Sequence, residues 1–114
     1  MNMIVKKPWG TYQVLSQEKN YLIKKIVVMP EGKLSLQSHQ HRSEHWVIIQ
    51  GFAKITIDGL TKQLKENQSL FIPKQIKHRI ENYGKKDLII IEVQFGDILN
   101  ENDITRYEDI YNRK

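Results

Sequence analysis

The sequence contains no cysteine. This absence excludes disulfide bonds, thiolate metal sites and cysteine nucleophiles, so a metal would have to be bound by histidine, carboxylate or amide groups. Long apolar runs are missing too, because the segment LIIIEVQF is interrupted by Glu92 and is much shorter than a bilayer span. The N-terminal segment lacks an apolar stretch with a small-residue cleavage site, which predicts a cytoplasmic protein with no membrane contact.

The chain also has no block of charge of one sign. Its 18 Lys and Arg residues outnumber the 13 Asp and Glu residues and give a formal net charge of +5, but they are scattered through the sequence. Nucleic-acid-binding proteins usually concentrate such residues in a patch or stripe, so we predict no nucleic-acid partner. A scattered excess of positive charge instead favours a small anionic ligand.

Short apolar segments separated by turn residues fill most of the chain. A length of 114 residues is enough for one hydrophobic core and therefore for one domain, residues 1–114. We expect about eight to ten short strands and almost no helix, which is typical of an all-β sandwich or barrel. After Gly96 we expect a short helix or an irregular tail. Strands are predicted over residues 21–29, 52–58, 76–82 and 87–95, with a weakly periodic strand over 60–66 and a brief apolar segment over 69–73.

Three of the four histidines lie close together in the sequence. His39 and His41 are two residues apart, so in a strand their side chains would leave the same face. Arg42 and Ser43 are expected to form a two-residue hairpin loop, which would place Glu44 across from His41. Two imidazoles and a carboxylate form a donor set that suits a divalent metal of intermediate softness.

The fourth histidine, His78, lies in a predicted strand. Alternation places it on the same face as Ile76 and Ile80 and places Arg79 on the opposite, outward face. His78 is therefore the expected fourth ligand, and a purely structural histidine cluster is the competing explanation. Zinc suits this donor set, as do iron, manganese, nickel and cobalt. The predicted ligands are His39, His41, Glu44 and His78.

These histidines belong to a wider pattern formed by Gly32, His39, His41, Glu44, Gly51, Pro73, His78 and Asn82. The pattern resembles the two signature motifs of the cupin superfamily, in which the first motif supplies two histidines and a glutamate and the second supplies a further histidine. The resemblance implies a cupin-type double-stranded β-helix, a jelly-roll barrel. The sequence of this chain departs from the family pattern in three ways. Only two residues separate His41 from Glu44, Gln75 stands where glycine is usual, and Asn67 replaces the glycine that opens the second motif.

Longer segments carry a closer resemblance: KPWGTYQVL, LSLQSHQHRSEHWVIIQG, ENQSLFIPKQIKHRIEN, IEVQFGDIL and ENDITRYEDIY. Together they look like the C-terminal domain of type II mannose-6-phosphate isomerases, bifunctional enzymes that also make GDP-mannose. The resemblance implies a zinc-dependent isomerase that interconverts mannose 6-phosphate and fructose 6-phosphate for polysaccharide synthesis. It also implies a homodimer, with strands paired across exposed sheet edges. The family's glycine-rich nucleotide loop has no counterpart among the six isolated glycines, so we expect the guanylyltransferase domain to be absent.

Residue roles follow from this implied reaction. Glu92, a charged residue in an apolar strand, is the first candidate for the proton-transfer base, and His45 is the second. Each also has a structural explanation, because Glu92 could protect a sheet edge and His45 should point outward by alternation. Gln37 is a rival metal ligand or a substrate contact. The predicted phosphate-binding residues are Arg42 first, followed by Arg79, Lys25 and Arg106.

Two other functions stay open at this level. A cupin separated from a nucleotidyltransferase could be a non-catalytic sugar-phosphate sensor or an accessory subunit, with the metal in a structural role. A metal-dependent oxygenase would use the same ligands. Oxygen consumption with bound iron would favour the oxygenase, whereas tight sugar-phosphate binding without turnover would favour the sensor.

Overall fold

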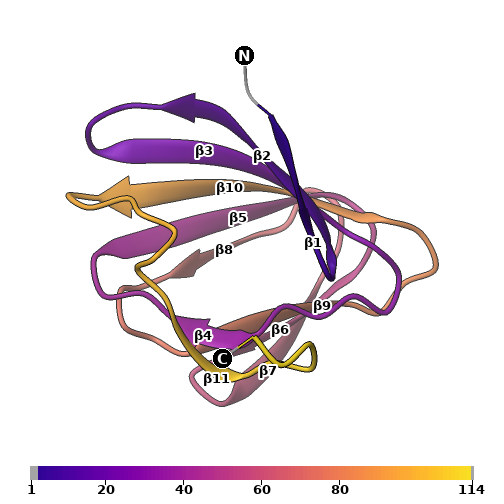
Figure 1. Ribbon diagram of the computed structural model, residues 1–114. Coiled ribbons are helices and arrows are strands. Elements are labelled where there is room, and N and C mark those ends of the chain that lie inside the picture. Colours follow the sequence, from indigo (N-terminus) through magenta and orange to yellow (C-terminus); the bar gives the residue numbers. More distant parts are fainter. Residues whose placement is uncertain (1–2, 114) are drawn as a thin grey trace.

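The computed structural model describes residues 3–113 and consists of two β-sheets that face each other (Figure 1). The expected all-β architecture is confirmed, and no helix occurs within these residues. In particular, they contain no helix with the length and apolar character needed to cross a membrane. The strands are β1 (Ile4–Lys7), β2 (Gly10–Gln17), β3 (Tyr21–Val28), β4 (Leu36–Ser38), β5 (Arg42–Gln50), β6 (Ala53–Ile57), β7 (Leu60–Leu64), β8 (Ser69–Ile72), β9 (His78–Asn82), β10 (Leu88–Gly96) and β11 (Thr105–Glu108).

The chain passes repeatedly from one sheet to the other. One sheet has six strands in the order β1-β2-β3-β10-β5-β8, and the second has five strands in the order β11-β4-β9-β6-β7. Neighbouring strands are antiparallel throughout both sheets. The long strands β3, β10 and β5 lie side by side in the larger sheet and provide most of the wall that faces the smaller one.

Alternation along the long strands separates the core from the outer face. In β3 every second residue is buried, and the same period appears in β5 and β10. Val28, Ile48 and Ile90 from these three strands are almost fully buried and pack in one cluster with Trp9 and Ile80. Each such aliphatic side chain contributes about 1.5–3 kcal/mol by leaving water, so this cluster holds the two sheets together.

The inward residues change from apolar to polar along the same strands. In β5 the inward positions are Ile48, Trp46, Glu44 and Arg42, and all four are buried. In β10 the inward position after Ile90 is taken by a buried carboxyl group, Glu92. Buried charges are stable only with compensating partners. This part of the space between the sheets is therefore built as a polar site rather than as core.

The hairpin predicted directly after His41 is wrong. β4 ends at Ser38 in the five-stranded sheet and β5 begins at Arg42 in the six-stranded sheet, so the connection crosses between sheets. Gly96 of β10 lies against this crossing, where a Cβ atom would collide with the His41 carbonyl oxygen. Because residues 39–41 are outside the strands, strand alternation does not place His39 and His41 on one face.

The expected helical or irregular tail is partly a strand. β11 pairs with β4 and extends the five-stranded sheet. Arg79 of β9 donates from Nη1 to Oε1 of Glu108 at 3.0 Å and from Nη2 to the Glu108 carbonyl oxygen at 3.1 Å. Lys24 of β3 forms an ion pair with Glu101 at 2.7 Å. The tail is therefore tied to both sheets.

Candidate metal centre

A cavity of about 310 Å³ lies between the two sheets, and its wall includes residues of both sheets and of the tail. This volume is at the lower end of the range for small-molecule sites, about 300–1,000 Å³. Positive groups outnumber negative ones in the wall, which suits an anionic ligand. The charged lining residues are Lys7, Lys24, Arg42, Arg79, Arg106, Arg113, Glu44, Glu92 and Glu101.

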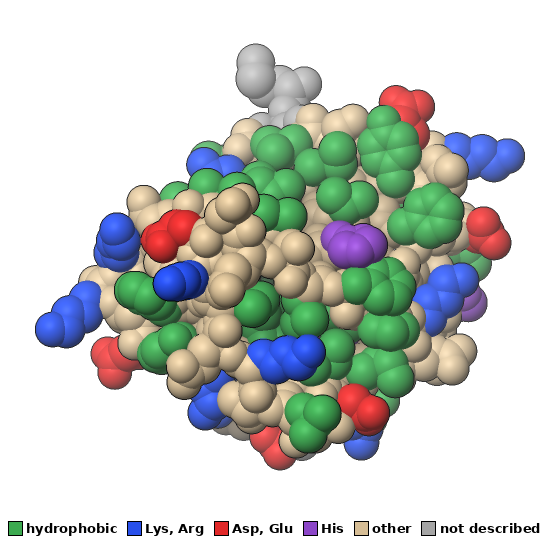
Figure 2. All heavy atoms as spheres, turned by 180° about the vertical axis from the view of Figure 1, so that it is seen from behind, with side chains coloured by type: hydrophobic (Ala, Val, Ile, Leu, Met, Phe, Trp, Pro, Cys, Tyr) green, Lys and Arg blue, Asp and Glu red, His purple; other side chains and the backbone are tan. Residues whose placement is uncertain are grey.

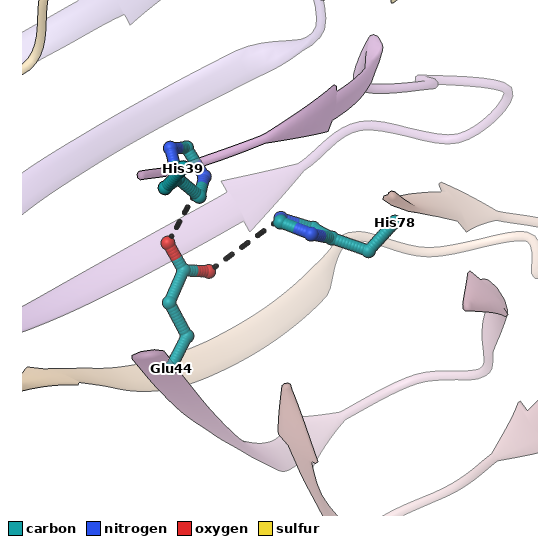
Figure 3. Close-up of side chains that lie close together, drawn as sticks. All are labelled: His39, Glu44 and His78. Carbon is teal, nitrogen blue, oxygen red and sulfur yellow. Dashed lines mark ion pairs between the residues drawn. The ribbon is translucent and has the colours of Figure 1, made fainter. Parts of the chain in front are cut away.

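Three of the four predicted metal ligands meet in this cavity (Figure 3). His39 follows β4, Glu44 points inward from β5 and His78 begins β9, so the group bridges the two sheets. Their ligand atoms all lie within 4.8 Å of one another. Nε2 of His39 is 3.2 Å from Oε2 of Glu44, and Nε2 of His78 is 3.9 Å from Oε1 of the same carboxylate. This metal-binding group could hold a divalent ion, because it offers two imidazoles and a carboxylate.

A backbone carbonyl fixes the second nitrogen of each histidine ring. Nδ1 of His39 lies 2.7 Å from the Asp103 carbonyl oxygen, and Nδ1 of His78 lies 3.0 Å from the Ile76 carbonyl oxygen. Because a carbonyl can only accept, each Nδ1 carries the hydrogen and each Nε2 keeps its lone pair for a metal. Burial, helped by the charge of Arg42, lowers the pKa of His39 to about 4, so this ring is neutral at neutral pH.

Arg42 is buried beside the same carboxylate. Its Nε donates to Oε2 of Glu44 at 2.8 Å, and its Nη2 lies 3.3 Å from Nε2 of His39. Burial raises the pKa of Glu44, but Arg42 and the other partners outweigh burial and hold the pKa of this carboxyl below its usual range. Arg42, predicted as the first phosphate ligand, is thus engaged with the metal-binding group. A cation held by His39 would displace the Arg42 contact to that ring.

Glu92, predicted as the proton-transfer base, lies in the cavity next to Glu44. Nε1 of Trp46 donates to both carboxylates at 3.0 Å, and Gln94 donates to Glu92 at 2.7 Å. Burial, reinforced by the negative charge of Glu44, raises the pKa of Glu92. This carboxyl group therefore holds a proton at higher pH than an ordinary glutamate does. Its catalytic role stays a prediction.

His41 and His45 lie outside the cavity, which corrects two of the predicted roles. His41 is exposed because the crossing between the sheets turns it toward the solvent, so it does not join the metal-binding group. His45 points outward from β5, as alternation predicts, and stacks on Phe71 with the ring centroids 4.7 Å apart. Neither side chain is placed for the ligand or proton-transfer role proposed for it.

Of the predicted phosphate ligands on β3 and β9, Arg79 lies in the cavity wall and Lys25 does not. Lys25 points to the outer face of β3, whereas Lys24 is buried and lines the cavity. Strand alternation could have identified Lys24 as an inward residue, because it shares a face with the buried apolar residues of β3. Arg79 is buried and lines the cavity, although the sequence predicts an outward, solvated side chain. Its ion pair with Glu108 of the tail explains the difference.

Gln37 and Arg106 line the cavity from neighbouring strands. Gln37 donates from its amide nitrogen to the Ser35 hydroxyl at 3.2 Å. The strand register places Arg106 opposite Gln37, and Gln37 opposite His78. Nε of Arg106 is buried and has no hydrogen-bond partner within residues 3–113. Because a buried donor without a partner is costly, and Arg106 lines the cavity, its guanidinium is the cavity group best suited to an anionic ligand.

Asp103 holds the loop that carries His39, which leads to a testable expectation. Its carboxylate accepts the backbone N–H groups of Gln40 and His41, each at 2.9 Å. Asp103→Ala removes both contacts, so we expect the affinity for zinc to fall about 10–100-fold, as for other partners that orient metal ligands. Isothermal titration of zinc into the purified variant measures this change.

Asp97→Ala is the matched control for Asp103→Ala. Asp97 is an exposed carboxylate that follows β10, at the start of the tail. Its removal changes the net charge equally, so it isolates the effect of the two loop contacts from general electrostatics. Equal zinc affinities for the two variants would contradict the orienting role of Asp103.

Known proteins resemble nearly the whole chain. It is 45% identical over 113 residues to the mannose-1-phosphate guanylyltransferase ManC of Salmonella typhimurium, covering 99% of this chain and 24% of that protein. It is 48% identical over 109 residues to the alginate biosynthesis protein AlgA of Pseudomonas aeruginosa, covering 96% and 23% respectively. The chain thus spans about a quarter of the length of these curated relatives.

The relatives correct the predicted function. The family resemblance of the sequence implies an isomerase that interconverts mannose 6-phosphate and fructose 6-phosphate. The relatives are instead named as mannose-1-phosphate guanylyltransferases or as proteins of alginate and xanthan biosynthesis. None of these names describes an isomerase, so the predicted isomerase function is overturned.

The fold comparison and the family match agree with the cupin resemblance. An RmlC-like cupin from Shewanella frigidimarina superposes with a TM-score of 0.77 at 19% identity, covering 89% of this chain and 87% of that chain. At this identity the likeness shows the fold alone, and it confirms the expected cupin double-stranded β-helix. Residues 1–109 match the family described as mannose-6-phosphate isomerase C-terminal. The chain therefore belongs to the mannose-6-phosphate isomerase C-terminal family.

Proposed function

We propose that this chain is a cytoplasmic, metal-dependent cupin that binds a mannose phosphate and serves a mannose-1-phosphate guanylyltransferase in polysaccharide synthesis. The observation that carries the proposal is one cavity lined both by the metal-binding group and by Arg106, whose buried Nε has no hydrogen-bond partner among the described residues. The names of the relatives supply the sugar phosphate and the guanylyltransferase.

The strand register supports a ligand with two different ends. Arg106 and His78 lie on strands separated by β4, which corresponds to about 10 Å across two strand spacings. A mannose phosphate has hydroxyl oxygens for a metal at one end and a phosphate for a guanidinium at the other. The two ends of the cavity therefore match the two ends of this ligand.

The metal in this proposal is zinc, held by His39, Glu44 and His78 with Gln37 beside them. The nitrogen and oxygen donors fit zinc, and the same donors accept iron, manganese, nickel or cobalt. The bound metal would supply a Lewis acid that orients and polarises oxygens of the sugar. In an enzymatic role, Glu92 would move a proton to or from the bound sugar, because its raised pKa lets it hold that proton.

Replacing Arg106 by alanine is expected to weaken mannose phosphate binding about 10–100-fold. The reason is that a hydrogen bond to a charged group contributes about 1.5–3 kcal/mol, and 1.4 kcal/mol corresponds to tenfold. Isothermal titration of mannose 1-phosphate and mannose 6-phosphate into the zinc-loaded proteins measures the change. Zinc affinity should stay at the wild-type value, since Arg106 is not in the metal-binding group.

Lys62→Ala is the control, because Lys62 is an exposed cation of β7 that does not line the cavity. Unphosphorylated mannose provides a second comparison, since its binding should not respond to Arg106→Ala. The proposed function fails if zinc-loaded wild-type protein binds neither mannose phosphate at millimolar concentration.

A further inference from the structure

The outer face of the six-stranded sheet is apolar. On β5, β8 and β10, the residues that point away from the second sheet include Val47, Ile49, Phe71, Ile91, Val93 and Phe95, which we call the outer apolar face. Figure 2 shows hydrophobic side chains gathered over one side of the molecule, with few charged groups among them. A histidine is surrounded by hydrophobic side chains in the same view.

The strand register makes this face continuous. Ile91 of β10 pairs with Val47 of β5, and Val93 pairs with His45. His45 in turn pairs with Phe71 of β8. Directly opposed side chains on neighbouring strands are about 5 Å apart, so these residues form one patch across three strands.

The largest side chains of the patch are open to solvent. Phe95 is 57% exposed, Ile49 is 50% exposed and Phe71 is 47% exposed. An antiparallel sheet with one face in water normally carries polar residues on that face. Here the outer face is apolar instead, and a continuous apolar patch of this kind is typical of a surface that a partner covers.

We propose that the outer apolar face is the contact between two copies of this chain, packed face to face about a two-fold axis. The distribution of charged residues favours a second copy of the chain as the partner of this face. The outward residues of β3, β5, β8 and β10 include one cation, Lys25, and no carboxylate. A charged partner would find almost nothing to pair with, whereas an identical apolar face is complementary without ion pairs.

The net charge of the protein also favours a contact through the outer apolar face. Each copy carries a formal charge of +5, so two copies repel unless they meet where charges are sparse. The outer apolar face is such a place. This contact differs from the paired sheet edges that the sequence predicts for a homodimer, because it uses side chains rather than backbone hydrogen bonds.

The area of the face reaches the lower limit for a specific contact. Together with the outward side of the adjoining strand β3, the face spans four strands about 4.8 Å apart. β3, β5 and β10 have eight or nine residues each and β8 has four, so at ~3.4 Å per residue the four strands cover roughly 500 Å² on each copy. Two such faces bury about 1,000 Å², which reaches the size expected of a specific interface. Side chains that project from the sheet increase this buried area further.

The test is the oligomeric state of a doubly charged variant, Ile49→Glu with Phe71→Glu. Wild-type protein at about 100 µM is expected to sediment as a dimer in analytical ultracentrifugation, and the variant as a monomer with a Kd raised at least about 100-fold. Neither residue lines the cavity, so zinc binding and the circular dichroism spectrum should be unchanged and report that the variant is folded.

Leu60→Glu is the matched control. Leu60 is 67% exposed on β7 of the other sheet, so its substitution adds a charge without touching the proposed contact and should leave the dimer intact. A monomeric wild-type protein at about 100 µM would overturn the proposal and assign the face to a different partner. A dimer that survives in the double variant, or that dissociates equally in Leu60→Glu, would also overturn it.

A second measurement covers the case in which the double variant does not fold. Because the sequence has no cysteine, a short bismaleimide reagent can join single-cysteine variants only between copies. His45→Cys, in the middle of the face, is expected to give a crosslinked dimer, and Leu60→Cys is expected to give none. Equal crosslinking of the two variants would contradict the face-to-face contact.

Discussion

Replacing His78 by alanine is expected to lower the affinity for zinc by about 100-fold or more. Loss of a residue that merely orients a metal ligand costs about 10–100-fold, and His78 supplies a ligand atom itself. It is also the ligand that the five-stranded sheet contributes from β9, opposite Glu44 of the six-stranded sheet. Its removal therefore leaves the metal-binding group without a ligand on the side of the five-stranded sheet. Isothermal titration of zinc, or metal analysis after dialysis, measures the loss of affinity.

His45→Ala is the matched control, since it removes an imidazole from the outer face of β5. Its zinc affinity should equal that of wild-type protein. His41→Ala should behave in the same way, because His41 is exposed on the crossing between the sheets. If His41→Ala lost zinc while His78→Ala retained it, the metal-binding group described above would be wrong.

The second large effect is expected for Arg42→Ala, which should lower the free energy of unfolding of the metal-free protein by about 3–5 kcal/mol. Removing one partner of a buried ion pair leaves the other charge buried without compensation. Arg42 and Glu44 are both almost fully buried, and the guanidinium also contacts His39. Urea unfolding followed by circular dichroism measures the difference.

Glu81→Ala is the comparison for this prediction. Glu81 pairs with Lys33 at 4.0 Å, and both side chains are partly exposed, so we expect a change below about 1 kcal/mol. A loss of less than 1 kcal/mol in Arg42→Ala would contradict the structural role of this guanidinium. The arginine would then be free to serve as the phosphate ligand that the sequence predicts.

The alternation of residues within single strands predicts well which side chains point inward and which point outward. The alternation of Ile76, His78 and Ile80 places the histidine inward, and the structure buries it in β9. The same reasoning turns His45 outward. These predictions hold because each depends on the two-residue period of a single strand.

Features that depend on distant pairing are predicted less well. His41 leaves the metal-binding group because β4 and β5 belong to different sheets, which no local period reveals. Arg79 is buried because the tail forms β11 and brings Glu108 against it. Asp103, also in the tail, orients His39 across a separation of 64 residues. Long-range contacts of this kind depend on the completed fold.

The most direct test of the central claim is a crystal of zinc-loaded protein soaked with mannose 6-phosphate, with anomalous diffraction recorded at the zinc edge. We expect one zinc peak about 2.0–2.2 Å from His39, Glu44 and His78, with the phosphate density beside Arg106. A zinc peak at His41 instead, or phosphate density outside the cavity, would contradict the account.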